Sequence, residues 1–334
     1  MTEFVWLPPA DYSGTAFNNF NASKSEFDLD NARAMIWTSQ LAYDTDQTID
    51  AVANRWGFSS ATPFVGDNAG LGGAYDTRGF FGERDDAVIL AFGGTDPGVW
   101  KNWDTDVRFR LDPATNTHSG IQAALKGVTG NNQKPDYVGQ AVSLSKQSDK
   151  PLWITGHSLG GALAVLAAQY VVSNGGAPKA IYTFGMPRPG GVQFQAAYNN
   201  DNRLGRVTYR FVHGLDVVSR IAPSVVGVGP LAVNYRHVGR VIQCDSARNF
   251  DPAVSPLSDI GSDEPSAAGD YAGLRSKALQ LLEAGWNLPA ILNDLGPVAP
   301  VSPPGPGLFG PAFVFLPLPI RDHLQDRYWT ALTP

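Results

Sequence analysis

One five-residue stretch, GHSLG at residues 156–160, combines residue types that can perform nucleophilic chemistry. Its pattern is G-x-S-x-G, and it lies between a strand-like run, LWIT, and an apolar helical run, GALAVLAAQYVV. A serine at a sharp strand-to-helix turn projects its hydroxyl above the sheet, and the glycines keep neighbouring side chains clear of the strand and helix. We therefore predict Ser158 as a nucleophile; a tight turn with a capping serine is the alternative.

A serine hydroxyl is a poor nucleophile and needs a histidine base that is oriented by a carboxylate. Asp216 lies in the segment HGLD that directly follows the strand-like run VTYRFV, and it is the predicted carboxylate; an aspartate that caps the next turn is the alternative. The chain order serine, acid, histidine favours His323, in the loop sequence RDHLQD, as the base. His213 and His237 remain alternative bases, whereas His118 and His157 are interpreted as structural.

The elements that must position these residues follow an alternating pattern. Buried strands are predicted over residues 87–92, 152–155, 180–184, 207–212 and 235–243, and helices over residues 27–44, 162–172 and 192–199. The first helix has Asp28 or Asp30 as its N-cap. Strands separated by helices of this length need crossover connections, so we expect an α/β fold with a mostly parallel sheet and helices on both faces.

Composition and charge exclude several classes of protein. The chain has 334 residues, a formal charge of −6, 43% hydrophobic and 17% charged residues, which is typical of a globular protein. The acidic balance and the lack of a basic cluster argue against nucleic acid as a partner. The single Cys244 excludes an intramolecular disulfide framework and a cysteine-based zinc site.

Two apolar stretches raise the question of a membrane span. The run at residues 151–172 contains His157, Ser158, Gln169 and three glycines, and residues 295–320 carry eight prolines, so neither is expected to cross a bilayer. The N-terminus has Glu3 where a signal peptide would be basic, and prolines at positions 8 and 9. We expect no classical signal peptide, so the cellular location stays open between the cytoplasm and export by a non-classical route.

Beyond Cys244 the sequence becomes polar and rich in turns. We expect one domain over residues 1–334, with an insertion over about residues 245–310 that contains a helix and a proline-rich flap.

Several motifs together resemble the class 3 (fungal-type) triacylglycerol lipases. They are WITGHSLGGALAVLAA, YTFGMPRPG, VHGLDVVSRIAP, LAFGGTD followed by WKNWDTDV, THSGIQAAL and NYRHVGRVI. The resemblance covers roughly residues 28–243 and 317–331. Two departures stand out: the chain reads Phe92-Gly93-Gly94-Thr95 where the family usually has an arginine before the second glycine, and the interval from Asp216 to His323 is 107 positions (323 − 216), longer than usual.

The resemblance implies an α/β-hydrolase fold and a role for each matching residue. Ser158 is the nucleophile, Asp216 the orienting carboxylate and His323 the base, and the backbone N–H groups of Leu159 and Thr95 are the oxyanion donors. No metal and no organic cofactor is implied.

The resemblance also implies a lid at about residues 96–103, which contains Trp100 and Trp103 and opens at a lipid–water interface. Two tryptophans that pack a short helix into the core would explain the same residues. The implied activity is hydrolysis of carboxylic esters of lipids, of the triacylglycerol type. The alternatives are phospholipids, polyesters or feruloyl-type esters as substrates, or a lipase-like binding protein with a silent site.

Overall fold

The computed structural model of the chain describes residues 7–66, 77–94, 110–131, 134–216, 218–220, 233–244, 249–251, 257–262 and 322–332. The predicted lid residues Trp100 and Trp103, and Thr95 before them, lie outside these ranges. So do the helix and the proline-rich flap of the predicted insertion over residues 245–310, of which only residues 249–251 and 257–262 are described.

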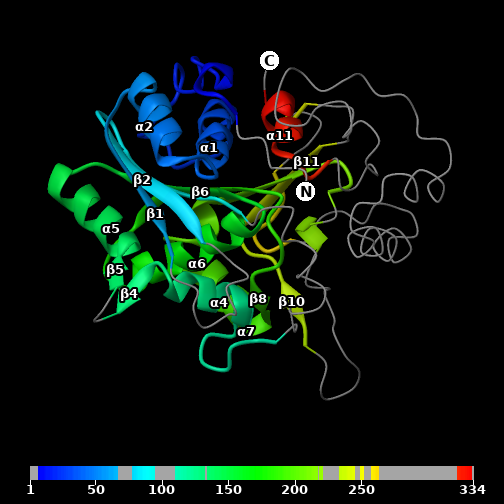
Figure 1. Cartoon of the computed structure of the whole chain (residues 1–334). Coiled ribbons are helices and arrows are strands. Elements are labelled where there is room, and N and C mark those ends of the chain that lie inside the picture. Colours follow the sequence, from blue (N-terminus) through cyan, green and yellow to red (C-terminus); the bar gives the residue numbers. More distant parts are fainter. Residues whose placement is uncertain are drawn as a thin grey trace, which may run out of the picture.

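A seven-stranded sheet forms the centre of the structure, in the order β1-β2-β3-β6-β7-β9-β11 (Figure 1). Its strands are β1 (Phe58–Val65), β2 (Arg78–Arg84), β3 (Val88–Phe92), β6 (Leu152–His157), β7 (Pro178–Phe184), β9 (Thr208–His213) and β11 (Arg240–Cys244). The five strands from β3 to β11 are parallel to one another, and β1 and β2 add an antiparallel edge. The predicted mostly parallel sheet is confirmed.

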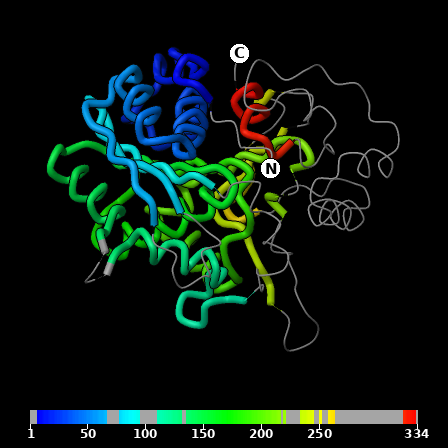
Figure 2. The backbone as a smooth tube through the Cα atoms, viewed as in Figure 1, coloured from blue at the N-terminus to red at the C-terminus, as the bar shows by residue number. Residues whose placement is uncertain are grey.

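Helices cover both faces of this sheet, as Figures 1 and 2 show. One layer holds α1 (Leu29–Leu41), α2 (Asp46–Arg55) and the red C-terminal α11 (Gln325–Ala331). The other holds α4 (Ser119–Lys126), α5 (Tyr137–Ser148), α6 (Leu159–Ser173) and α7 (Val192–Asn200). Short elements complete the set: η1 (Pro9–Asp11), η4 (Gly205–Val207), η5 (Val218–Arg220), and the small pairs β4 (Thr129–Asn131) with β5 (Lys134–Asp136) and β8 (Gly190–Gly191) with β10 (Tyr235–Arg236).

Successive side chains of each central strand point to opposite faces of the sheet, so each strand contributes to the core under both helix layers. In β3, Ile89 and Ala91 pack into the core beneath α1, while Leu90 and Phe92 pack beneath α6. Because a central parallel strand is buried on both faces, its sequence is a continuous apolar run rather than an alternating one. α6 is likewise buried along nearly its whole length, which accounts for the small apolar residues that follow the GHSLG stretch.

Most predicted elements appear close to their expected positions. The first helix begins after Asp28, whose carboxylate accepts a hydrogen bond from the Asn31 N–H at 3.0 Å, as an N-cap residue does. The prediction of one strand over residues 235–243 was wrong: β10 pairs with β8, whereas β11 pairs with β9. Gly239, with φ of +70°, turns the chain between them. His237 therefore lies between two strands, not on a strand face.

No helix in the described part of the chain is long and apolar enough to cross a membrane.

Candidate active site

The strand β6 and the helix α6 meet at Ser158 in a sharp turn. Ser158 has φ of +59° and ψ of −132°, a backbone conformation that L-residues rarely adopt and that costs of order 1–3 kcal/mol. A methyl group at Gly156 would overlap the carbonyl of Gly160, and one at Gly160 would overlap the carbonyl of Phe92. The two glycines of the motif are therefore required by the close approach of strand and helix, as predicted.

The Ser158 hydroxyl makes no hydrogen bond with the other described residues. Ser158 is buried, its backbone N–H donates to the Phe184 carbonyl at 2.8 Å, and its Oγ has no hydrogen-bond partner among the described residues. A capping serine would use this oxygen to accept from the first turn of the helix, and Ser158 does not. The arrangement suits a nucleophile better than a cap.

Asp216 and His323 form a buried pair next to this turn. The Nδ1 atom of His323 lies 2.8 and 2.9 Å from the two carboxylate oxygens of Asp216. Asp216 comes from the loop after β9, and His323 comes two residues before α11. Because the carboxylate only accepts, Nδ1 carries the hydrogen, and the unprotonated Nε2 is the nitrogen that can take a proton.

Asp216 is held by more than the imidazole. The Tyr328 hydroxyl donates to Oδ2 at 2.6 Å, and the Val218 N–H donates to Oδ1 at 2.8 Å. Burial, followed by the charge of Asp216, raises the pKa of Tyr328 well above its usual value, so this hydroxyl stays a donor. Three donors thus fix the carboxylate, as the orienting member of a triad requires.

Gly185 places the pair beside the serine turn. It directly follows Phe184, whose carbonyl accepts from Ser158, and a methyl group on Gly185 would lie 2.6 Å from Asp216 Oδ2 and 2.8 Å from His323 Nδ1. The ring of His157 also lies 4.6 Å from the ring of His323, centroid to centroid. The structure thus brings Ser158, Asp216 and His323 together at the carboxyl edge of the parallel strands.

The predicted oxyanion donors are described in part. Leu159 begins α6, so its N–H is one of the groups at a helix N-terminus that have no partner within the helix. Thr95 lies outside the described residues. The residue before it, Gly94, is so close to the serine that a methyl group there would lie 2.9 Å from Ser158 Cβ.

The other predicted bases have partners elsewhere. His237 Nε2 lies 2.7 Å from the Ser219 carbonyl, and His213 Nδ1 lies 3.4 Å from Asp322 Oδ1. His213 ends β9 and Asp216 lies in the loop after it, whereas Asp322 and His323 are neighbours just before α11. The contacts His213–Asp322 and Asp216–His323 therefore cross each other between these two segments. Asp322 also accepts from the Leu215 N–H at 2.8 Å, and these contacts join the two segments.

Sequence reasoning missed three side chains near the site: Tyr328, which donates to Asp216, Asp322, which accepts from Leu215, and Tyr43, which contacts His157. Tyr328 lies on α11, which has seven residues and is too short to show a helical pattern. Asp322 has a weak signal, because it directly precedes the predicted base. The described residues contain no group of three or more His, Cys, Asp or Glu side chains that could hold a metal ion.

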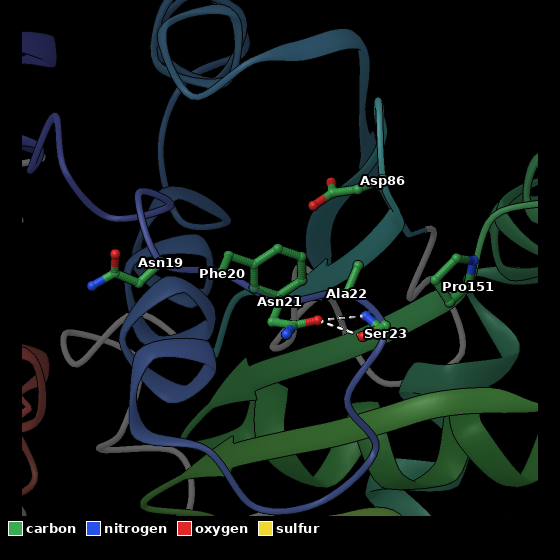
Figure 3. Close-up of a pocket in the computed structure, with 7 residues that line it drawn as sticks. All are labelled: Asn19, Phe20, Asn21, Ala22, Ser23, Asp86 and Pro151. Carbon is green, nitrogen blue, oxygen red and sulfur yellow. Dashed lines mark hydrogen bonds between the residues drawn. The ribbon is translucent and has the colours of Figure 1, made fainter.

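A separate hollow of about 510 Å³ lies away from this site. Figure 3 shows its lining, which includes Phe20, Asn21, Asp86 and Pro151. Pro151 precedes β6, whereas Ser158 follows it, so the hollow lies at the opposite end of that strand from the serine. It has no part in the chemistry of the site.

The sheet order, the serine turn and the order of the three residues define an α/β-hydrolase fold. Comparisons with known proteins agree. Residues 89–226 match the family model described as lipase (class 3). The mono- and diacylglycerol lipase of Aspergillus oryzae has a similar crystal structure, with a TM-score of 0.54 and 20% identity, over 70% of this chain and 86% of that one.

Two relatives are similar in sequence. The secreted mono- and diacylglycerol lipase 1 of Fusarium solani is 30% identical over 55% of this chain and 56% of its own length. The triacylglycerol lipase OBL1 of Ricinus communis is 28% identical over 63% of this chain and 49% of its own length. The chain thus spans about half the length of these relatives. The match to the class 3 lipase model is confined to residues 89–226, which include Ser158 and Asp216.

Proposed function

We propose that this protein hydrolyses carboxylic esters of lipids through an acyl-enzyme formed on Ser158. The observation that carries the proposal is the buried Asp216–His323 contact at 2.8 Å beside a serine in a strained strand-to-helix turn. The match of residues 89–226 to the class 3 lipase model supports it, as do the mono-, di- and triacylglycerol substrates in the names of the relatives.

The proposed reaction uses each residue for one task. Ser158 Oγ attacks the ester carbonyl while His323 Nε2 takes its proton, and Asp216 stabilises the imidazolium that forms. The negative charge on the carbonyl oxygen is met by the N–H of Leu159 and, as proposed from the family resemblance, that of Thr95; one such donor typically contributes about 2.7–4 kcal/mol. His323 then protonates the leaving alcohol, and a water molecule that His323 activates releases the fatty acid.

The lid belongs to the same proposal. Trp100 and Trp103, within residues 96–103, are aromatic side chains suited to a lipid–water interface. Peripheral binding there would increase turnover of aggregated substrate. Specific activity on a short-chain ester, measured below and above the concentration at which the ester aggregates, tests this point. Equal activity in both states would remove the reason for a lid.

A substrate panel tests the activity itself. We expect purified protein to release fatty acid from acylglycerols, and Ser158→Ala to abolish the release while the free energy of unfolding is retained. Phosphatidylcholine, a feruloyl ester and a polyester film complete the panel. Preference for one of these over every acylglycerol would replace the proposed substrate, and no turnover of any ester by folded protein would favour a silent binding protein.

A further inference from the structure

His157, the residue before the nucleophile, contacts the main chain of the base. Its Nε2 atom lies 2.8 Å from the carbonyl oxygen of His323, and its Nδ1 atom lies 3.0 Å from the hydroxyl of Tyr43. All three residues are buried. The sequence interpretation of His157 as structural covers its burial but not these two contacts, which join the nucleophile turn to the loop that carries the base.

The two partners determine the protonation of His157. A carbonyl oxygen only accepts, so Nε2 must carry the hydrogen. Nδ1 then has a lone pair and accepts a hydrogen bond from the Tyr43 hydroxyl. This hydroxyl lies 3.0 Å from Nδ1 and 3.3 Å from the His157 carbonyl oxygen, so Nδ1 is the nearer of its two acceptors. Burial, and next the proximity of His323, lower the pKa of His157 well below its usual value. The imidazole is therefore neutral and has one defined tautomer.

A neutral ring at this place suits the reaction. The rings of His157 and His323 lie 4.6 Å apart, at an interplanar angle of 31°. During the proposed reaction His323 becomes an imidazolium, and a second positive charge at this distance in a buried site would oppose that step.

We propose that His157 is a positioning residue that holds the His323 backbone in register with Ser158, in a tautomer that Tyr43 selects. The inference rests on the proposed function. Asp216 fixes the imidazole of His323, but His323 lies in a turn before α11, outside regular secondary structure. Since Ser158 directly follows His157, one side chain sets the spacing between nucleophile and base. A misplacement of about 1 Å costs about 10²-fold in rate.

Kinetics of matched variants test the proposal. On a dissolved short-chain ester, His157→Leu should lower kcat about 10²-fold with little change in KM, since ground-state binding is not affected. His157→Gln, which can place an amide N–H near the position of Nε2, should recover most of that loss. Tyr43→Phe should lower kcat, whereas Tyr198→Phe, which removes a buried hydroxyl 2.9 Å from Thr208 Oγ1 in a different part of the fold, should not.

A merely structural role predicts a different pattern. His157→Leu and His157→Gln would then both lose stability, while the folded fraction, counted by active-site titration, would keep wild-type kcat. That result would overturn the proposal. If His157→Leu fails to fold, kcat of the Tyr43→Phe and His157→Gln variants is compared with that of the wild type instead. Wild-type kcat in Tyr43→Phe would count against the role of Tyr43.

A spectroscopic test does not depend on activity. Nitrogen-15 NMR of histidine-labelled wild-type protein at neutral pH should show His157 protonated at Nε2 only, with the assignment made by comparison with His157→Gln. Protonation at Nδ1, or at both nitrogens, would overturn the proposal. A wild-type protein that hydrolyses no ester would refute the proposed function alone, because the tautomer would still be measured.

Discussion

Replacement of Gly185 by alanine is expected to damage the site at one defined point. The added methyl group would lie 2.6 Å from Asp216 Oδ2 and 2.8 Å from His323 Nδ1, whereas ordinary van der Waals contact begins at 3.4 Å. The carboxylate and the imidazole must therefore move by about 0.8 and 0.6 Å, or the Gly185 backbone must move instead. Both groups are buried and hydrogen-bonded, so neither can turn aside into solvent.

The magnitude follows from this displacement. A shift that approaches 1 Å in a catalytic group costs about 10²-fold, which corresponds to about 2.7 kcal/mol in the barrier. Gly185 also has φ of +58°, where an alanine costs about 1–2 kcal/mol of stability. We expect Gly185→Ala to lower kcat about 10²-fold and to lower the free energy of unfolding as well.

Gly175→Ala is the matched control. Gly175 has φ of +74°, but a methyl group there would have no atom within 4 Å. The Gly175→Ala variant should lose about the same free energy of unfolding, measured by urea unfolding, as the positive φ costs at Gly185. It should keep wild-type kcat on p-nitrophenyl butyrate. Wild-type kcat in folded Gly185→Ala, or equal losses of kcat in both variants, would refute the reasoning that places the pair against Gly185.

Three further expectations follow from the same contacts. Tyr328→Phe removes a donor to the Asp216 carboxylate, and steady-state kinetics should show kcat lowered about tenfold to a hundredfold with KM retained; unchanged kcat would mean that the hydroxyl does not support Asp216. Asp322→Ala removes the acceptor for Leu215 and the partner of His213, and urea unfolding should show a loss of about 1–3 kcal/mol; no loss would show that the crossed contact contributes nothing. Burial lowers the pKa of His118 from 6.5 to about 4, so between these values the unfolded chain binds a proton that the folded chain does not. The contribution of His118 is thus complete above pH 6.5 and falls by about 3 kcal/mol as the pH drops through that window. Urea titrations of wild type and His118→Gln at several pH values should show a smaller fall in the variant, and identical curves would contradict the assignment.

The serine turn was predictable because its causes are local. The motif, the apolar strand before it and the apolar helix after it all lie within residues 152–172, and the structure has β6, Ser158 and α6 there. Asp216 was predicted from its position in the short loop after a strand. His323 could be chosen only by chain order and loop character, since 107 residues separate it from Asp216.

The supporting contacts were not predictable for a physical reason. Tyr43 contacts His157 across 114 residues, and His157 contacts the His323 carbonyl across 166. No local pattern encodes which buried hydroxyl or carbonyl a histidine will meet, because that depends on how distant elements pack. The antiparallel edge was missed because β1 contains Pro63 and β2 contains Gly79 and Gly82, which are unfavourable in strands.

The central claim, that Ser158 is a nucleophile activated by His323, is tested most directly by covalent labelling. Folded protein is treated with a fluorophosphonate probe, and the modified residue is identified by peptide mass spectrometry. We predict stoichiometric labelling of Ser158, much slower labelling in His323→Ala and none in Ser158→Ala. Absence of label on the wild-type protein, or label on any other residue, would contradict the claim.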